Sequence, residues 1–247
     1  MIRIDNISKQ NGHQIVFIEA SAALQRGEKV GLVGANGTGK TTLFRLITGE
    51  EQPDEGQISL DRGVTIGYFS QDVGEMKGRS AIAEVMDGVG PVSEVAIELK
   101  ALESAMADPA RYDELESLVE RYGEVQAKFE ELDGYALESR AREVLSGLSF
   151  TDEMMESDVG VLSGGWKMRV ALAALLFSEP DLLLLDEPSN HLDLEASLWL
   201  ENFLKNYPAM MVVISHERDL LNNVVDNILH LAGGKVQKPD FVPADFL

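Results

Sequence analysis

The chain of 247 residues contains no cysteine and half as many basic as acidic residues. Without cysteine it can form neither disulfides nor cysteine-ligated zinc or iron–sulfur centres, which fits a cytoplasmic protein. Its 21 lysines and arginines stand against 42 acidic residues, so its formal net charge is −21. A chain this acidic repels phosphate backbones and anionic lipid surfaces. We therefore expect no broad, non-specific nucleic-acid binding.

Long apolar runs are also missing. The longest run of leucine, isoleucine and valine covers residues 182–185, whereas a membrane-spanning helix needs roughly 18 or more apolar residues in succession. Residues 1–6 alternate between polar and apolar, as a β-strand does, and lack the apolar core of a signal peptide. The hydrophobic fraction of 45% is ordinary for a globular domain. We expect a cytoplasmic protein without membrane insertion.

The chain falls into three segments of different character. Residues 1–70 contain short strand patterns separated by turns and one helix over about 40–48. Residues 76–147 are helical and charged. In residues 148–247 helices alternate with strands, which predicts a parallel sheet. The helices expected there cover about 165–177 and 194–206, and the strands cover 182–185 and 210–214.

A stripe of mostly apolar side chains follows residues 112–132 in steps of three or four, as on one face of an amphipathic helix. Asp108 and Pro109 precede it and are typical of a helix start. Packing between the two helices of an antiparallel hairpin explains the stripe most simply, and a surface for a partner is the alternative. The stripe consists of Tyr112, Leu115, Val119, Tyr122, Gln126, Phe129 and Leu132.

Residues 34–41 match the phosphate-binding loop (P-loop) pattern G-x-x-x-x-G-K-[ST]. A predicted strand leads into the loop and a predicted helix follows it. Its glycines let backbone N–H groups turn inward around a phosphate, and the helix N-terminus adds partial positive charge. Lys40 would contact the β- and γ-phosphates, and the Thr41 hydroxyl would contact Mg²⁺. The predicted nucleotide-binding residues of this loop are Gly34, Asn36, Gly37, Thr38, Gly39, Lys40, Thr41 and Thr42.

Two carboxylates follow a second predicted strand. Residues 182–185 are four leucines, typical of a strand buried on both faces, and Asp186 and Glu187 come next. Parallel sheets bind their ligands at the carboxyl ends of their strands. Asp186 can hold Mg²⁺ there, and Glu187 can polarise an attacking water. Acids after a strand are a weak signal alone, but they become specific in a chain that carries a P-loop.

Three further motifs occur in a set order along the chain. Gln71 follows a predicted strand, Leu-Ser-Gly-Gly occupies residues 162–165, and Ser215 and His216 follow the strand at 210–214. Together with the P-loop and the two acids, they resemble an ATP-binding-cassette (ABC) ATPase over essentially the whole chain. The resemblance implies ATP and Mg²⁺ as cofactors. It also implies an α/β fold: a P-loop ABC ATPase core with an N-terminal antiparallel β subdomain and an inserted helical arm.

Details of the motifs resemble one class, ABC-F. Trp166 stands where transporter cassettes usually carry Gln, and residues 187–193 and 215–218 are close to that class's EPTNHLD and SHDR forms. The helical segment resembles the arm of that class. ABC-F proteins are paired cassettes without membrane domains and are typically ribosome-associated translation factors. The resemblance therefore implies a cassette that hydrolyses ATP, closes as a dimer and acts on the ribosome.

The resemblance also implies roles by position. Glu187 would orient the hydrolytic water as general base, His216 would contact the γ-phosphate, and Gln71 would sense the metal and the γ-phosphate. The metal site would consist of Thr41, Gln71 and Asp186. A structural hydrogen bond at a strand end is the alternative for His216. His13 and His230 match no motif and are expected to be structural.

A second ABC cassette is the implied partner. Ser163, Gly164 and Gly165 would reach the γ-phosphate of the ATP held by that partner, and Asp193 would lie in a loop that communicates across the dimer. Each ATP would need Lys40 from one cassette and Ser163 from the other. A lone copy should therefore hydrolyse ATP poorly.

The sequence departs from the family pattern in places. Asn11 stands where cassettes usually carry an aromatic residue that stacks on adenine, which puts the preference for adenine in doubt. Ser189 for Thr and Glu217 for Asp preserve polarity and change little.

We expect residues 1–247 to form a single ABC ATP-binding domain, with the arm inserted at about 76–147 and a linker starting at about 236–247. ABC-F chains normally hold two cassettes, so this one is expected to be half of such a protein or to pair with another chain. An ATP-binding subunit of a membrane transporter is the alternative function. A module that binds ATP without turnover is disfavoured because Glu187, Gln71 and His216 are all present.

Overall fold

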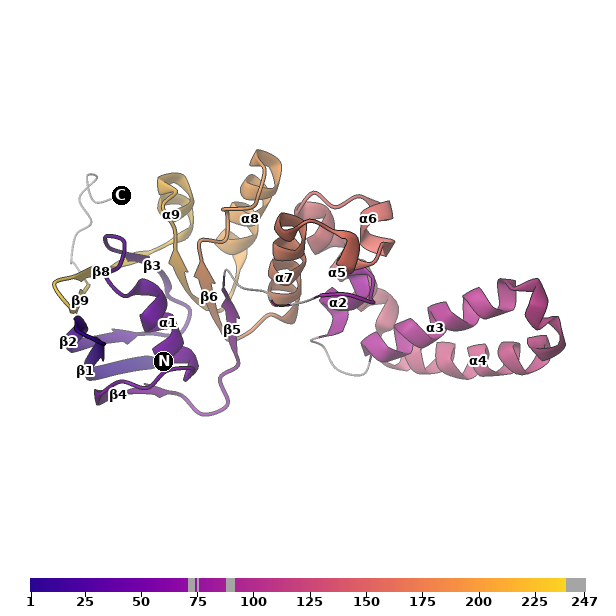
Figure 1. The fold of residues 1–247 in the computed structure, drawn as a ribbon, viewed down its shortest axis with the longest axis horizontal. Coiled ribbons are helices and arrows are strands. Elements are labelled where there is room, and N and C mark those ends of the chain that lie inside the picture. The colour runs from indigo at the N-terminus through magenta and orange to yellow at the C-terminus, as the bar shows by residue number, and fades with distance from the viewer. Residues whose placement is uncertain (71–73, 75, 88–91, 239–247) are drawn as a thin grey trace. The chain divides into compact units, whose positions relative to one another are not determined.

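The computed structural model describes residues 1–70, 74, 76–87 and 92–238. The chain divides into two compact units, one made of Met1–Asp72 with Glu179–Leu247 and the other of Val73–Ser178. The second unit is thus an insertion in the sequence of the first, and Figure 1 labels the elements of both. No described helix is long and apolar enough to cross a bilayer.

Two sheets form the first unit. An antiparallel sheet has the strand order β2-β1-β4, and a second sheet has the order β5-β6-β7-β3-β8-β9. The second sheet is parallel from β5 to β8, while β9 runs antiparallel to β8. The strands are β1 (Ile2–Asn11), β2 (Gln14–Leu24), β3 (Lys29–Val33), β4 (Glu55–Leu60), β5 (Ile66–Phe69), β6 (Leu182–Asp186), β7 (Met210–Ile214), β8 (Asn227–Ala232) and β9 (Lys235–Gln237).

The side-chain patterns explain the two kinds of sheet. The start of β1 alternates, with Ile2 and Ile4 buried and Arg3 exposed, as in a sheet with one face on a core. β6 and β7 are buried at every position, as in parallel strands covered on both faces. The predicted antiparallel N-terminal sheet and the predicted parallel sheet are both confirmed.

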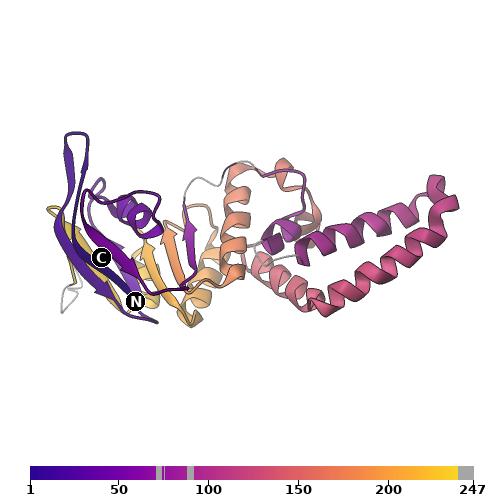
Figure 2. The same cartoon turned by 90° about the horizontal axis from the view of Figure 1, so that it is seen from below.

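Helix α1 (Lys40–Thr48) joins the two sheets into one hydrophobic core. Its Leu43 and Phe44 belong to the same buried cluster as Phe17 of the antiparallel sheet and Leu184 of the parallel sheet. Figures 1 and 2 show α1 between the two sheets. Burial of each such side chain contributes roughly 1.5–3 kcal/mol, so the helix that follows the P-loop is firmly held. Helices α8 (Leu194–Asn206) and α9 (Arg218–Val224) complete this unit.

Three neighbouring strands bring the sequence motifs together. β6, β7 and β3 are adjacent and parallel, so their carboxyl ends meet at one edge of the sheet. The P-loop follows β3, Asp186 ends β6, and Ser215 and His216 follow β7. The topology therefore places three motifs that are far apart in the sequence around one point.

The second unit is helical. Helices α3 and α4 form an antiparallel hairpin, visible side by side in Figures 1 and 2, and α2 and α5 pack against α7. This confirms the predicted inserted hairpin. The elements are α2 (Ala81–Met86), α3 (Val92–Ala107), a 3₁₀ helix (Pro109–Glu114), α4 (Leu115–Glu131), α5 (Gly134–Gly147), α6 (Asp152–Glu156), a 3₁₀ turn (Val159–Val161) and α7 (Gly164–Ser178).

Two details of the predicted stripe were wrong. Asp108 caps a 3₁₀ helix by accepting a hydrogen bond from the Ala110 N–H at 2.9 Å, and the α-helix begins only at Leu115. Tyr112 lies in this 3₁₀ helix, where the α-helical period does not apply, and is 76% exposed. Val119 is also exposed, because Leu118 occupies the buried position next to it.

The elements after residue 214 were not predicted. α9, β8 and β9 are short, and β9 (Lys235–Gln237) overlaps the start of the stretch 236–247 that was expected to begin a linker. Residues 239–247 lie outside the described part of the chain, so the linker stays a prediction.

Candidate nucleotide-binding site

The P-loop connects β3 to α1 in a conformation that two of its glycines permit. Gly37 has φ of +80° and Gly39 has φ of +100°, in the left-handed region that disfavours other residues. Space is also limiting, since a Cβ atom on Gly39 would lie 2.3 Å from Val16 Cγ1. Gly39 precedes α1 and provides no side-chain cap, so the first N–H groups of the helix can face an anion.

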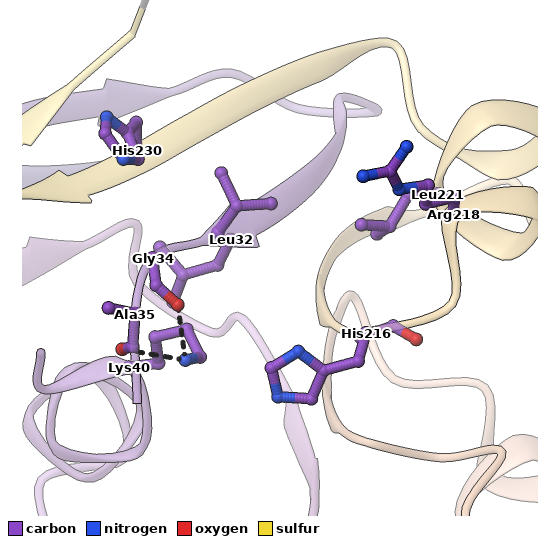
Figure 3. Close-up of a pocket in the computed structure, with 10 residues that line it drawn as sticks. Leu32, Gly34, Ala35, Lys40, His216, Arg218, Leu221 and His230 are labelled. Carbon is purple, nitrogen blue, oxygen red and sulfur yellow. Dashed lines mark hydrogen bonds between the residues drawn. The ribbon is translucent and has the colours of Figure 1, made fainter. Parts of the chain in front are cut away.

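Lys40 lies over the loop that precedes it. Its ammonium donates hydrogen bonds to the carbonyl oxygens of Gly34 at 2.8 Å and Ala35 at 3.3 Å, as Figure 3 shows. Thr38 closes the loop through its hydroxyl, which donates to the same Ala35 carbonyl at 2.9 Å. Lys40 also lines a cavity of about 280 Å³ together with His216, so the lysine and the histidine predicted from separate motifs share one site.

Thr41 and Asp186 are brought together by α1 and β6. The Thr41 hydroxyl donates to Asp186 Oδ2 at 2.7 Å, and Asp186 is only 6% exposed. Within the described ranges, no three His, Cys, Asp or Glu side chains cluster as a metal site would require. A cation here would therefore have to complete its coordination with water and with oxygen atoms of a ligand, as Mg²⁺ does at phosphate sites.

Glu187 is buried in a strained conformation at the end of β6. Its φ is +52°, and its N–H donates to the Ile214 carbonyl at 2.9 Å. Its Oε2 accepts a hydrogen bond from the backbone N–H of His216 at 3.2 Å. Burial raises the pKa of Glu187, and the contacts with His216 oppose this shift only in part. The other oxygen, Oε1, lies 3.3 Å from His216 Nε2 but has no hydrogen-bond partner among the described residues.

Most of the predicted residues of this site surround one cavity of about 390 Å³. Sequence reasoning missed Gln14, Val16 and Ile214 on its wall. Gln14 Nε2 donates to the Gly37 carbonyl at 3.3 Å and so fastens the β1–β2 hairpin to the P-loop. No motif marks these residues, because the fold alone brings them to the loop. The predicted residues on the wall are Asn36, Gly37, Gly39, Lys40, Thr41, Thr42, Asp186, Glu187 and His216, and the cavity also includes Asn11.

Tyr68 is a further neighbour that the sequence did not single out. It lines a separate cavity with Thr41 and Asp186. Burial, together with the charge of Asp186, raises the pKa of Tyr68 to about 12. The phenol therefore stays neutral beside Thr41 and Asp186, two of the three residues predicted to bind the metal.

The other predicted residues lie elsewhere. Gln71 falls outside the described residues, and its role stays a prediction. Ser163, Gly164 and Gly165 belong to the second unit, where α7 begins at Gly164. The Ser163 carbonyl accepts a hydrogen bond from the Lys167 N–H at 3.0 Å.

Two residues of the recognised motifs have structural contacts of their own. The Trp166 ring meets Phe150 edge-on, with centroids 4.9 Å apart, and the Arg169 guanidinium lies 4.4 Å from its centre. Packing within the second unit thus accounts for a tryptophan at this position. Asp193 caps α8, since its side chain accepts from the Ala196 N–H at 3.0 Å.

Comparisons with known proteins identify the family of the chain. The family model described as ABC transporter matches residues 18–190. The chain is 37% identical over 233 residues to YfmM of Bacillus subtilis (strain 168), an uncharacterized ABC transporter ATP-binding protein, covering 94% of this chain and 44% of that protein. It is also 37% identical to ABC transporter F family member 3 of Arabidopsis thaliana, covering 95% of this chain and 34% of that protein.

These relatives are longer, and this chain spans less than half of either. A solved dimeric ATP-binding cassette, in a post-hydrolysis state bound to ADP and Pi, superposes with a TM-score of 0.67 at 20% identity, covering 98% of this chain and 100% of that one. The P-loop, Asp186 and Glu187 all lie within the residues that the family model matches. The chain therefore belongs to the ABC transporter family of ATP-binding cassettes, and its similarity to the plant F-family member confirms the predicted resemblance to ABC-F.

Proposed function

We propose that this cassette binds ATP with Mg²⁺ and hydrolyses it to ADP and phosphate. The observation that carries the proposal is the convergence of the P-loop, Asp186, Glu187 and His216 around one cavity. A phosphate-binding loop, oxygen ligands for a cation, and a buried carboxylate are the components that phosphoryl transfer to water requires. One oxygen of that carboxylate accepts no hydrogen bond from any described residue.

The residues present fit a magnesium–phosphate group. Thr41 and Asp186 offer two hard oxygen atoms 2.7 Å apart, and Mg²⁺ at phosphate sites uses one or two such protein ligands besides water and phosphate oxygens. When bound, the ion would neutralise charge that develops on the phosphates. Lys40 would supply the second positive charge. Its ammonium now bonds to two loop carbonyls, and phosphate oxygens would become its stronger, charged acceptors.

Glu187 would activate the water. Oε2 accepts a hydrogen bond from the backbone N–H of His216, so Oε1 is the oxygen available to accept a proton. In the reaction the water oxygen bonds to the γ-phosphorus while Oε1 takes its proton. The bond to the bridging oxygen breaks, and ADP leaves with that electron pair. The raised pKa of Glu187 makes its carboxylate a stronger base than an exposed glutamate.

A second cassette would complete the site. We propose that Ser163, Gly164 and Gly165 contact the γ-phosphate of an ATP held by the partner, and that Gln71 responds to the metal. The dimeric form of the solved cassette with the same fold supports this arrangement. Light scattering of the Glu187→Gln variant with saturating ATP and Mg²⁺ should detect a dimer. A monomer under these conditions would defeat pairing between copies of this chain.

The proposed target is the ribosome, in the cytoplasm, with ATP-driven closure moving the helical hairpin during translation. Similarity to the F-family member supports it. The transporter alternative is supported by the description of the family model and by the name of the Bacillus subtilis relative. Purification of the tagged protein from its native cells separates the two. Co-sedimentation with ribosomes supports the first, and recovery with membrane permeases but no ribosomal protein supports the second.

Hydrolysis itself is tested by measuring phosphate release from ATP with purified protein. We expect release that depends on Mg²⁺ and whose rate per molecule rises with protein concentration, because two cassettes must meet. A chain that binds ATP but releases no phosphate at any concentration would be a nucleotide sensor and not an ATPase.

A further inference from the structure

Tyr68 and Asp186 lie on the same face of the parallel sheet. β5 and β6 are neighbouring parallel strands in which Tyr68 pairs with Leu184. Asp186 is two residues beyond Leu184, so its side chain points to the same face. One strand across and two residues along separate the Cα atoms of Tyr68 and Asp186 by about 8 Å, a gap that a tyrosine and an aspartate side chain can close. Both residues line one cavity of about 640 Å³, together with Thr41.

The ring of Tyr68 is held by α1. The Phe44 ring meets it edge-on, with centroids 5.7 Å apart, and Tyr68 packs against the buried cluster that contains Phe44 and Leu184. These contacts are apolar. The hydroxyl at the far end of the ring therefore needs a polar partner of its own, which must come from the groups around the cavity or from water.

Asp186 can accept a second hydrogen bond. The Thr41 hydroxyl donates to Oδ2 at 2.7 Å, and an ionised carboxylate has about four lone-pair sites on its two oxygens. Asp186 is buried, and a buried carboxylate is costly unless it is hydrogen-bonded. A phenol keeps its proton at neutral pH, because its ordinary pKa is about 10. Tyr68 is thus a donor beside an acceptor that has room for another hydrogen bond.

The other carboxylates around this cavity are weaker acceptors for the phenol. Arg45, Glu50 and Glu51 also line the cavity. Arg45 Nη1 lies 3.4 Å from Glu51 Oε1, so Glu51 already has a cationic partner. Glu50 is exposed to water, and a hydrogen bond in a buried site is electrostatically stronger than one in water. Asp186 is therefore the acceptor that gains most from the Tyr68 hydroxyl.

We propose that Tyr68 is a positioning residue of the metal site, whose hydroxyl donates to Asp186 Oδ1 and holds this carboxylate in the orientation that binds Mg²⁺. The inference rests on the metal site proposed for Thr41 and Asp186. Tyr68 itself would touch neither the ion nor the nucleotide. Carboxylates that bind metals are hydrogen-bonded in turn, and losing such a partner lowers metal affinity by roughly 10-fold to 100-fold.

Tyr68→Phe tests the inference, because it removes the hydroxyl and keeps the ring that contacts Phe44. Binding of AMP-PNP to the full chain is measured by calorimetry at a series of Mg²⁺ concentrations and again in excess EDTA. We expect the Mg²⁺ concentration for half-maximal binding to rise by about tenfold or more, while the Kd in EDTA and the Tm match the wild type. An unchanged Mg²⁺ requirement overturns the inference. A Kd in EDTA that weakens by the same factor also overturns it, since a purely structural role would have that effect.

Two further variants locate the effect. Tyr122→Phe is the matched control, because it removes a hydroxyl that donates to Glu103 at 3.1 Å in the second unit, and it should leave the Mg²⁺ requirement unchanged. In a Glu50→Ala background, Tyr68→Phe should keep its full effect. An effect that disappears there would assign the hydroxyl to Glu50 and overturn the inference. If the wild type binds AMP-PNP equally well with Mg²⁺ and with EDTA, the proposed metal site itself fails, which is a different result from an unaltered Tyr68→Phe.

Discussion

His216 contacts both oxygen atoms of the Glu187 carboxylate. Its backbone N–H donates to Oε2 at 3.2 Å, and its ring Nε2 lies 3.3 Å from Oε1. The two residues follow the adjacent parallel strands β6 and β7, so the sheet itself sets their separation. Glu187 also keeps a φ of +52°, a conformation that costs on the order of 1–3 kcal/mol for such a residue. The fold thus maintains strain and burial at the residue proposed to activate water.

The buried charge of Glu187 should make stability depend on pH. Because burial raises its pKa, its contribution to stability is full below the ordinary glutamate pKa and is lost as pH rises through the folded value. A glutamine side chain is uncharged at every pH, so burying it carries no free-energy cost that depends on pH. We expect the Tm of Glu187→Gln to exceed that of the wild type at pH 8, and the gap to narrow at pH 5. Calorimetry that gives the same gap at both pH values would contradict the assigned pKa shift.

Lys40→Ala should weaken nucleotide binding at least tenfold, since a hydrogen bond to a charged group contributes about 1.5–3 kcal/mol. Titration with AMP-PNP measures the loss. The matched control is Lys205→Ala, which removes an exposed lysine from the last turn of α8. Equal affinity for wild type and Lys40→Ala would mean that residues 34–41 do not hold the phosphates.

Thr41→Val should raise the Mg²⁺ concentration needed for half-maximal nucleotide binding by about tenfold. Valine keeps the shape but removes the hydroxyl that lies 2.7 Å from Asp186. The expected tenfold change corresponds to about 1.4 kcal/mol of lost metal-binding free energy. Thr48→Val on the same helix is the control, because the Thr48 hydroxyl donates to the Arg45 carbonyl and lines none of the cavities around Asp186. A Mg²⁺ requirement that both variants share with the wild type would remove Thr41 from the metal site.

Gly39→Ala should destabilise the protein more than Gly37→Ala. Both positions have positive φ, so both variants incur backbone strain of about 1–3 kcal/mol. Only at Gly39 does the added Cβ also meet a neighbour, 2.3 Å from Val16 Cγ1, whereas nothing lies within 4 Å at Gly37. Urea denaturation of both variants compares them, and equal midpoints would show that the loop does not pack on β2 as described.

The elements that the sequence predicted best are those with the strongest local signals. β6 and β7 are aliphatic throughout, and the P-loop glycines fix the turn between β3 and α1. The short strands β8 and β9 were missed because their neighbours in the sheet stabilise them, and α9 was missed because it is stabilised by packing against α8. No local pattern records either kind of contact. In the predicted stripe on α4, Val119 was assigned a buried position that Leu118 occupies in the structure.

The residues of the nucleotide-binding site also fall into those that the sequence could place and those that it could not. Asp186 and His216 could be placed beside the P-loop because parallel strands end at a common edge. The wall made by Gln14 and Val16 could not, since it depends on how the antiparallel sheet folds against the P-loop. The strained φ of Glu187 was equally out of reach, because glutamate has no intrinsic preference for that conformation.

Phosphate release from ATP by the Glu187→Gln variant decides whether Glu187 acts as the general base. The variant keeps the shape of the side chain but removes the base, so we predict release at least 100-fold slower than in the wild type, with AMP-PNP binding unchanged. Glu195→Gln, at an exposed glutamate in the first turn of α8, should hydrolyse ATP at the wild-type rate. Glu187→Gln protein that releases phosphate as fast as the wild type would contradict the account.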